Sequence, residues 1–189
     1  FLDTIKRFVD NKLIPREDEV ADTNNIPNDI VEEMKNIGLF GISIPTEYGG
    51  SNLSMEQEVE LTFELGRASP AFRSMAGTNI GIGSQTIVMS GTDEQKNKYL
   101  PKFSTGEIIG SFALTEPDSG SDAMSIKTTA KKNGNKYIIN GTKRYITNAP
   151  IAGVFSVMAR TKKEKSSSSI SCFLVDSSLP GITIGKPDK

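Results

Sequence analysis

The amino-acid sequence predicts an α+β multidomain protein, with an all-α N-terminal helical domain followed by an antiparallel β-barrel or sandwich-like domain. Two observations predict this order. Before residue 107, apolar residues recur at helical spacing behind helix-start signals, whereas later residues form short β-branched or aromatic runs separated by turn residues. Because helices and strands are segregated along the chain, we expect separate domains at residues 1–107 and 108–189.

The composition is that of an ordinary globular protein, with 36% hydrophobic and 24% charged residues among 189. A formal net charge of −1 offers no basic excess for binding nucleic acid. Polar residues interrupt every long apolar window, so no stretch is suited to span a bilayer. We therefore predict neither a nucleic-acid partner nor a membrane association.

The sequence contains no histidine and a single cysteine. The lack of histidine excludes Ser-His-Asp and Cys-His catalysis, and every histidine-containing metal site, from within this chain. One cysteine excludes an intrachain disulfide and cysteine-rich zinc sites, so no metal site is predicted. Cys172 lies in an apolar run, which predicts a buried, inert thiol, and a cytoplasmic setting is expected.

The first half of the chain contains a series of helix signals. Pro15 is expected to interrupt the first helical run, Pro27 opens the second helix, and Gly38 closes it as a left-handed cap. Capping-box patterns at Ser54 and Thr92 start two later helices. The expected helical segments are residues 1–14, 27–38, 54–66, 70–89 and 92–106.

Three glycines interrupt the helix pattern of residues 70–89. Gly77, Gly81 and Gly83 each lower helix propensity, by about 1 kcal/mol relative to alanine. They are explained either by tight packing of another helix or by close approach of a ligand, and the sequence leaves both open.

The second half contains short strand-like runs, and its expected strands are residues 108–114, 124–132, 137–140, 143–147, 154–160, 170–175 and 182–184. Asn133-Gly134 predicts a hairpin with a type I′ turn, and Asn140-Gly141 predicts a second turn. Residues 160–169 are polar and serine-rich, which predicts a mobile hairpin loop, with phosphate binding by its lysines as the alternative.

The most ligand-like stretch is FALTEPDSGSD, residues 112–122. A strand there runs into Thr115 and then into a turn with two serines and a glycine. Amides freed at a strand end, in a loop whose glycine permits close approach, suit carbonyl or phosphate oxygens. On spacing alone, Thr115 and Ser121 could equally cap turns and Tyr145 could belong to a core. Glu116 is interpreted as structural rather than as a catalytic base.

Several motifs occur in a fixed order. FALTEP from Phe112 precedes SGSD, and YIINGTK from Tyr137 precedes YITN from Tyr145. Earlier in the chain lie GLFGI from Gly38 and GTDEQK from Gly91. Together they resemble the signature of the acyl-CoA dehydrogenases, and the likeness extends over essentially the whole chain.

The resemblance implies an N-terminal helical domain, a middle β-domain and a C-terminal four-helix domain. The sequence starts at Phe1 in mid-pattern and stops where the middle domain would end, so we expect a C-terminal part to be missing. The family's catalytic glutamate usually lies in that part. No catalytic residue is therefore assigned within this chain.

The resemblance also implies FAD as cofactor and an acyl-CoA substrate that is oxidised to trans-2-enoyl-CoA in fatty acid β-oxidation. Electrons would pass to electron-transfer flavoprotein, and the full-length protein would be a homotetramer or homodimer. A relative of the same fold could instead be an acyl-CoA oxidase or flavin monooxygenase. A fragment lacking the base could also be catalytically inert.

By the resemblance, cofactor-binding residues come from two stretches. The pyrimidine side of the flavin would meet Phe112, Ala113, Leu114 and Thr115, and its pyrophosphate would meet Gly120 and Ser121, with Ser121 also close to the acyl-CoA substrate. Tyr145 would lie against the flavin ring, opposite the substrate. Thr147 would hydrogen-bond near flavin N5, with Ile146 between them. The family more often has Trp at the position of Tyr145, and Tyr or Trp at the position of Phe112. Phe112 lacks the hydroxyl of Tyr, so a contact made by that group in relatives is not expected here.

Overall fold

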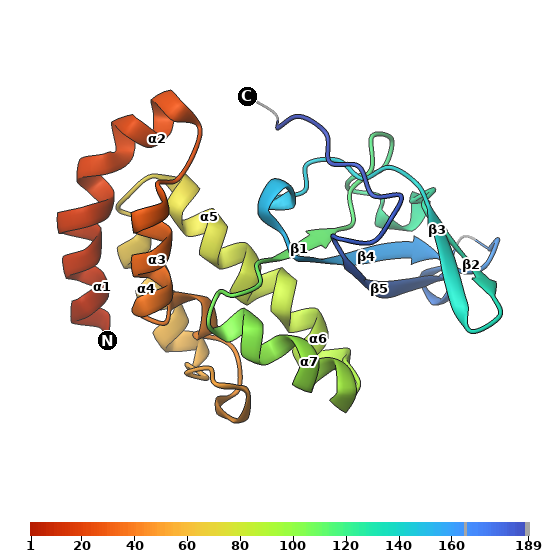
Figure 1. The fold of residues 1–189 in the computed structure, drawn as a ribbon, viewed down its shortest axis with the longest axis horizontal. Helices are drawn as coiled ribbons and strands as arrows, with labels where there is room; N and C mark the ends of the chain where they lie inside the picture. The colour runs from red at the N-terminus through yellow and green to blue at the C-terminus, as the bar shows by residue number, and fades with distance from the viewer. Residues whose placement is uncertain (165, 188–189) are drawn as a thin grey trace. The chain divides into compact units, whose positions relative to one another are not determined.

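The computed structural model describes residues 1–164 and 166–187, and the chain divides into two compact units (Figure 1). Unit 1 runs from Phe1 to Ile109, and unit 2 begins at Gly110. Unit 1 is helical and unit 2 is built around a sheet, in the order that the sequence predicts. No helix of the described residues is both long and apolar enough to cross a membrane.

Unit 1 consists of α-helices joined by short loops and by turns of 3-10 or π geometry. The α-helices are α1 Leu2–Phe8, α2 Glu17–Thr23, α3 Asn28–Asn36, α4 Met55–Leu65, α5 Pro70–Thr78, α6 Ser84–Ser90 and α7 Asp93–Ser104. The shorter turns are η1 Val9–Leu13, η2 Ile14–Arg16, η3 Leu39–Gly41, η4 Thr46–Tyr48 and η5 Asn79–Gly83.

Both predicted capping boxes are present. At the start of α4, the Ser54 hydroxyl accepts a hydrogen bond from the Gln57 N–H, and the Gln57 side chain accepts one from the Ser54 N–H. Thr92 and Gln95 make the same reciprocal pair at the start of α7. These bonds satisfy amides that the first helical turn leaves without partners, which explains why the sequence signal located both helix starts.

Pro15 interrupts the regular α-helix, as predicted, although helical turns continue past it. The helical path from α1 continues through η1 and η2, with Pro15 inside η2, and then into α2 up to Thr23. The local change to π and 3-10 geometry accommodates a residue that has no N–H to donate. The left-handed cap expected at Gly38 is present, with φ of 74°.

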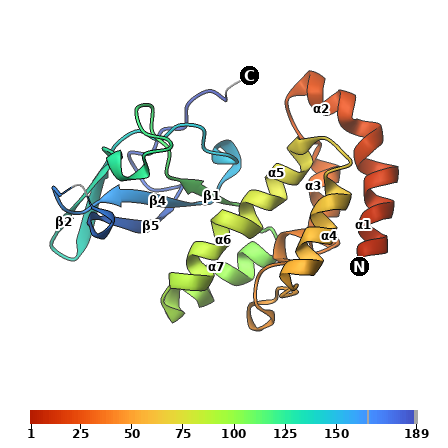
Figure 2. The same ribbon diagram turned by 180° about the vertical axis from the view of Figure 1, so that it is seen from behind.

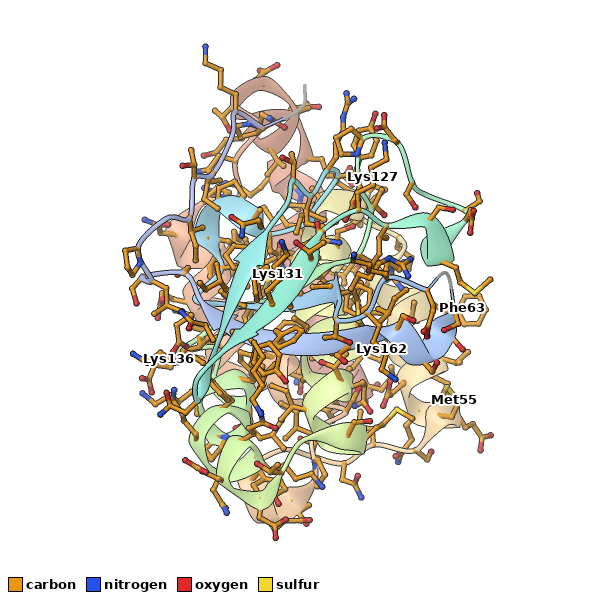
Figure 3. The ribbon with its side chains drawn as sticks, turned by 90° about the vertical axis from the view of Figure 1, so that its right-hand side faces the viewer. Met55, Phe63, Lys127, Lys131, Lys136 and Lys162 are labelled. Atoms are coloured by element: carbon orange, nitrogen blue, oxygen red, sulfur yellow. The ribbon has the colours of Figure 1, made fainter. Side chains whose placement is uncertain are left out.

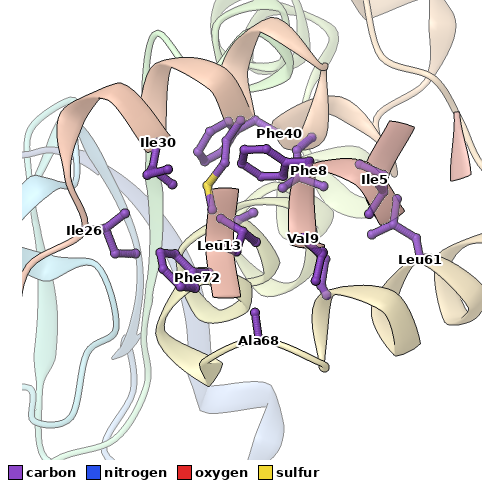
Figure 4. Packing of buried hydrophobic residues seen from close by; sticks show 14 of the residues in the cluster. Ile5, Phe8, Val9, Leu13, Ile26, Ile30, Phe40, Leu61, Ala68 and Phe72 are labelled. Carbon is purple, nitrogen blue, oxygen red and sulfur yellow. The ribbon is translucent and has the colours of Figure 1, made fainter. Parts of the chain in front are cut away.

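The core of unit 1 is apolar and fully enclosed (Figure 4). Phe8 from α1, Phe40 from η3 and Phe72 from α5 are 0–4% exposed and pack with aliphatic side chains from α3 and α4. Burying such a side chain stabilises a fold by about 1.5–3 kcal/mol. The amphipathic spacing of the helices is therefore what holds this unit together.

Residues 70–90 form one helical path, with η5 between α5 and α6. An added Cβ at Gly77 would touch only Arg73 of its own helix, and at Gly81 it would meet open space. Tight packing of another helix is therefore not the explanation for these two glycines among the described residues. Ligand approach stays a prediction for them.

Unit 2 contains strands β1 Gly110–Ala113, β2 Thr129–Asn133, β3 Lys136–Asn140, β4 Val154–Arg160 and β5 Ile170–Asp176. In the described part of the chain these strands form one sheet in the order β1-β4-β2-β3, with β5 also paired to β4. Seen from in front and from behind, β1, β4 and β5 lie side by side (Figures 1 and 2).

The sheet is mixed and open, which corrects the antiparallel barrel or sandwich-like prediction. β1 pairs with β4 in parallel, whereas β5 with β4 and β2 with β3 are antiparallel. Between β1 and β4 the chain makes a long crossover that contains the β2–β3 hairpin, so it returns in the same direction. The sequence shows short strands but not this connection.

Two predicted strands are wrong and a third begins late. Residues 143–147 are irregular, because Tyr145 and Asn148 adopt positive φ values of 57° and 64° that interrupt an extended strand. Residues 182–184 have no strand partner within the described part of unit 2. The strand expected at residues 124–132 begins only at Thr129, after the 3-10 turn η6 Ala123–Ser125.

The β2–β3 hairpin is present, but its turn differs from the prediction. Asn133 pairs with Lys136, so the loop residues are Gly134 and Asn135. Only Gly134 has a positive φ, 61°, whereas a type I′ turn needs positive φ at both loop residues. The polar loop predicted at residues 160–169 joins β4 to β5, and its Lys165 lies outside the described residues.

The buried thiol predicted from the apolar run of β5 is wrong. Cys172 is exposed. The reason is that β5 pairs only with β4 among the described strands and therefore forms an edge of the sheet. An apolar run at a sheet edge is covered on fewer sides than the same run in a central strand.

Candidate functional site

The end of β1 and the irregular segment at residues 143–148 lie against each other; we call residues 110–122 and 143–148 the strand-end region. The Ser111 hydroxyl donates to the Thr147 carbonyl oxygen (2.5 Å), and the Lys143 ammonium donates to the Leu114 carbonyl oxygen (2.9 Å). The Arg144 N–H donates to the Thr115 carbonyl oxygen (2.9 Å). These bonds bring together the two stretches that the sequence singled out.

A buried ion pair joins the two parts of the strand-end region. Glu116 is 5% exposed, and its Oε1 lies 2.9 Å from Nζ of Lys143, whose side chain is 11% exposed. The same carboxylate accepts hydrogen bonds from the backbone N–H groups of Lys127 (2.5 Å) and Thr128 (2.9 Å). Glu116 therefore holds the end of β1, the segment before β2 and residue 143 together.

The environment of this pair shifts both pKa values. Burial alone would raise the pKa of Glu116, but hydrogen bonds from Thr128, from the Lys127 N–H and from Lys143 outweigh it and lower the pKa to about 2. For Lys143, burial is the larger effect and lowers the pKa of the ammonium, while Glu116 opposes that shift. The carboxylate is thus ionised at neutral pH, which supports the structural interpretation of Glu116.

In the turn after β1, the Thr115 and Ser121 hydroxyl groups that were predicted to bind a ligand remain available for one. Glu116 and Ser119 exchange backbone hydrogen bonds (2.9 and 3.2 Å), and the Ser119 hydroxyl donates to the Asp122 carbonyl oxygen (2.6 Å). Ser119 is therefore the turn-capping serine. Among the described residues, the Thr115 and Ser121 hydroxyls make no hydrogen bond, so neither caps this turn.

Tyr145 is an exposed aromatic residue in an unusual backbone conformation. Its side chain is 66% exposed and its φ is 57°, in the left-handed region that non-glycine residues seldom adopt. The Arg144 guanidinium carbon lies 4.6 Å from the ring centroid. The alternative that Tyr145 belongs to a core is wrong, and an exposed flat ring beside a hydrogen-bonding strand end suits a planar ligand.

The other predicted site residues differ in exposure. Ala113 is buried, whereas Phe112, Leu114, Thr115 and Ile146 are half-buried. Gly120, Ser121 and Thr147 are exposed, and an added Cβ at Gly120 would meet nothing within 4 Å. Hydrogen bonds tie Leu114 and Thr115 to residues 143–144, while Gly120 and Ser121 join them only through the Glu116–Ser119 turn.

These residues fit a flavin by their chemistry. Thr115, Ser121 and Thr147 offer hydroxyl groups for the polar edge and phosphates, Gly120 permits close approach, and Tyr145 offers a ring for stacking. A metal cofactor has no comparable support, because no cluster of three or more His, Cys, Asp or Glu side chains occurs in residues 1–164 and 166–187.

Sequence reasoning missed two residues of the strand-end region. Lys143 was placed in a strand and given no partner, and Ser111 was not singled out. Lys143 is followed directly by Arg144, so the sequence does not single it out as the partner in a buried ion pair. The serine in β1 is not singled out either, because small polar residues are common in strands.

Two family models cover nearly the whole chain. The acyl-CoA dehydrogenase N-terminal domain matches residues 1–107, and the acyl-CoA dehydrogenase middle domain matches residues 111–189. The chain belongs to the acyl-CoA dehydrogenase family. The resemblance drawn from the sequence motifs is thereby confirmed.

Curated relatives extend well beyond the matched region. An acyl-CoA dehydrogenase of Bacillus subtilis (strain 168) is 35% identical over 185 residues, which cover 98% of this chain and 49% of the relative. A 3-(aryl)acrylate reductase of Clostridium sporogenes (strain ATCC 15579) is 40% identical over 181 residues, which cover 96% of this chain and 48% of that relative. The chain thus spans about half the length of these relatives.

Solved structures share the fold closely. A chain of a structure described as the electron transferring flavoprotein of Acidaminococcus fermentans matches with a TM-score of 0.94 and 34% identity, over 100% of this chain and 50% of that chain. An acyl-CoA dehydrogenase complexed with FAD from Bacillus anthracis matches with a TM-score of 0.88 and 35% identity. The match covers 100% of this chain and 32% of that chain.

Proposed function

We propose that this chain forms the helical and middle domains of an FAD-dependent acyl-CoA dehydrogenase, which oxidises an acyl-CoA to its trans-2-enoyl-CoA. The observation that carries the proposal comes from the middle domain of this family member. Two segments joined by a hydrogen bond present unbonded hydroxyl groups on one side of that bond and an exposed aromatic residue on the other. A related enzyme that shares this fold is a complex with FAD. FAD supplies the acceptor for the hydride from the substrate β-carbon.

The residues of this chain have positioning roles in that reaction. Thr115 and Thr147 hydrogen-bond the polar edge of the flavin, and Tyr145 covers one of its faces and excludes water. Gly120 and Ser121 bind the pyrophosphate, with Ser121 also facing the acyl-CoA. Phe112, Ala113, Leu114 and Ile146 form the backbone and apolar wall of the same site.

The proton from the substrate α-carbon requires a base, and Glu116 does not suit that role. An effective general base has a pKa near the working pH. Glu116, the buried carboxylate nearest to the predicted flavin-binding residues along the chain, has a pKa of about 2 and is engaged by Lys143. This supports the expectation that the catalytic glutamate belongs to a further part of the protein.

We further propose electron-transfer flavoprotein as the electron acceptor. The similarity to a chain from an electron transferring flavoprotein structure supports this partner. A homotetramer or homodimer and a role in fatty acid β-oxidation are proposed from the family resemblance alone, and a cytoplasmic location is proposed from the single free cysteine.

Anaerobic reduction of the bound flavin tests the proposal. The purified protein that contains this chain should carry a flavin chromophore that bleaches when a saturated acyl-CoA is added. Reoxidation should then require an electron carrier. Rapid turnover in air without a carrier would indicate an oxidase instead, and a colourless protein that binds no FAD would contradict the proposal.

Residue substitutions test the placement of the site. Thr147→Val and Ser121→Leu should each weaken flavin binding or slow its reduction, because one removes a hydroxyl and the other fills the space beside Gly120. An exposed substitution on the β2–β3 hairpin, Lys131→Met, is the control (Figure 3). Unchanged flavin content and reduction kinetics in both site variants would show that the site lies elsewhere.

A further inference from the structure

The Leu114–Thr115 peptide group is held by a hydrogen bond to its carbonyl oxygen. Its carbonyl oxygen accepts a hydrogen bond from Lys143 Nζ (2.9 Å), and the next carbonyl, of Thr115, accepts one from the Arg144 N–H (2.9 Å). No cis peptide bond occurs among the described residues. In a trans peptide the C=O and N–H groups point in opposite directions, so the Thr115 N–H points away from Lys143.

That N–H group is available for a ligand. None of the hydrogen bonds among residues 1–164 and 166–187 uses the Thr115 N–H as donor, and the Thr115 hydroxyl is likewise unused. Thr115 is half-buried, so part of the residue is open to solvent or to a ligand. An unused backbone donor at such a position is costly unless water or a ligand accepts its hydrogen bond.

We propose that the Glu116–Lys143 ion pair is a positioning device that fixes the Leu114–Thr115 peptide, so that the Thr115 N–H and hydroxyl face the flavin. Lys143 does not touch the cofactor in this role. It acts through Leu114, while Glu116 fixes the position of Lys143. The inference rests on the proposed function for the identity of the ligand, but its backbone part can be tested without any flavin.

The contacts of Glu116 explain why the lysine is held in one place. One carboxylate oxygen receives both Lys143 Nζ and the Thr128 N–H at 2.9 Å, and the other receives the Lys127 N–H at 2.5 Å. With its carboxylate bound on both oxygens, Glu116 has little freedom to turn. Lys143 consequently reaches the Leu114 carbonyl from a fixed position.

Stability alone is a poor explanation for this pair. Removing two charges from water costs about as much free energy as their attraction returns, so well-packed apolar residues are often equally stabilising. What an ion pair adds is direction, because the ammonium must meet the carboxylate and the carbonyl together. The pair therefore fixes the position of the Leu114–Thr115 peptide, whose N–H is the unused donor.

A double variant distinguishes the loss of peptide positioning from the effect of leaving a buried carboxylate unpaired. Lys143→Met alone leaves the buried Glu116 carboxylate unpaired, and the protein could lose stability for that reason only. In Glu116→Gln/Lys143→Met no charge is left unpaired, but nothing holds the Leu114 carbonyl oxygen. Glu107→Gln is the matched control, because it makes the same acid-to-amide change outside the strand-end region, at an exposed pair with Lys102.

The first readout is the dissociation constant for FAD, titrated into the flavin-free protein. Since a hydrogen bond to a charged group contributes about 1.5–3 kcal/mol, losing the fixed peptide should weaken binding by about 10-fold or more in the double variant. Glu107→Gln should bind FAD as the wild type does. Wild-type affinity in the double variant, with folding retained, would overturn the proposal, because the pair would then be merely structural.

The second readout is amide hydrogen exchange in the flavin-free protein. The Arg144 N–H, which donates to Thr115, should exchange faster in the double variant and at the wild-type rate in Glu107→Gln. Unchanged exchange at Arg144 would show that the pair does not hold this backbone, whatever the ligand is. If exchange changes but the wild-type protein binds no FAD, the proposed function fails while the positioning of the peptide stands.

Discussion

The core of unit 1 and the strand-end region of unit 2 are ordered by different interactions. In the core, side chains such as Phe40 and Phe72 are fully enclosed and belong to a cluster of apolar residues (Figure 4). In the strand-end region, a buried ion pair and hydrogen bonds to carbonyl oxygens hold an irregular segment against a strand. Apolar packing has no preferred direction, whereas hydrogen bonds have one. The comparison teaches that apolar burial in the core of unit 1 stabilises the fold, whereas directional bonds in the strand-end region fix the positions of backbone groups.

The largest effect is expected in the core. Phe72→Ala should lower the free energy of unfolding by about 3–5 kcal/mol, because it leaves a cavity that the surrounding helices fill only in part. Denaturant unfolding measures this. The matched control is Phe63→Ala on α4, where the ring is 75% exposed and projects into solvent (Figure 3). Equal losses in the two variants would contradict the assignment of the core.

A pH-dependent effect should distinguish the strand-end region from the core. The folded-state pKa of Glu116, about 2, lies below its ordinary value of 4.5, so the unfolded chain binds more protons between these values. The contribution of Glu116 to stability is therefore fully present above about pH 4.5 and is lost as the pH falls toward 2.

The difference in unfolding free energy between the wild type and Glu116→Gln should accordingly shrink over that acidic range. Phe72→Ala should instead lose the same amount at every pH, because no titrating group is involved. Parallel stability curves for the wild type and Glu116→Gln would show that the carboxylate is not held as described.

A smaller effect is expected at a helix end. Thr92→Ala should cost about 1 kcal/mol, because it removes the hydroxyl that accepts a hydrogen bond from the Gln95 N–H. Thermal unfolding checks this, with Thr92→Ser as the control that keeps the hydroxyl. A loss as large in the serine variant would mean that the methyl group, not the cap, is responsible.

The two regions also differ in how far the sequence predicts them. Helix starts at Ser54 and Thr92 were located because a capping box is a local pattern within four residues. The parallel pairing of β1 with β4 depends on a connection that spans the hairpin, which no local pattern reveals. Local signals therefore described unit 1 well and the topology of unit 2 poorly.

The strand-end region shows the same limit at the level of single residues. The stretch at residues 112–122 and the run at residues 145–147 were selected from the sequence, and the structure brings them together. The extended conformation expected at residues 143–147 was wrong. The Thr115 carbonyl oxygen and the Ser111 hydroxyl instead bond the Arg144 N–H and the Thr147 carbonyl oxygen, which a sheet would otherwise bond. The Glu116–Lys143 pair joins residues far apart in the sequence, and so has no local signature.

The amide signal of Thr115 tests the central claim, that the strand-end region binds the flavin. Isotope-labelled protein should be titrated with FAD while the N–H resonances of Thr115, Arg144 and Lys131 are followed by NMR. We predict that the Thr115 N–H shifts and becomes protected from exchange on binding, while Lys131 on the β2–β3 hairpin stays unchanged. FAD binding that leaves the Thr115 N–H unshifted and unprotected would contradict the account.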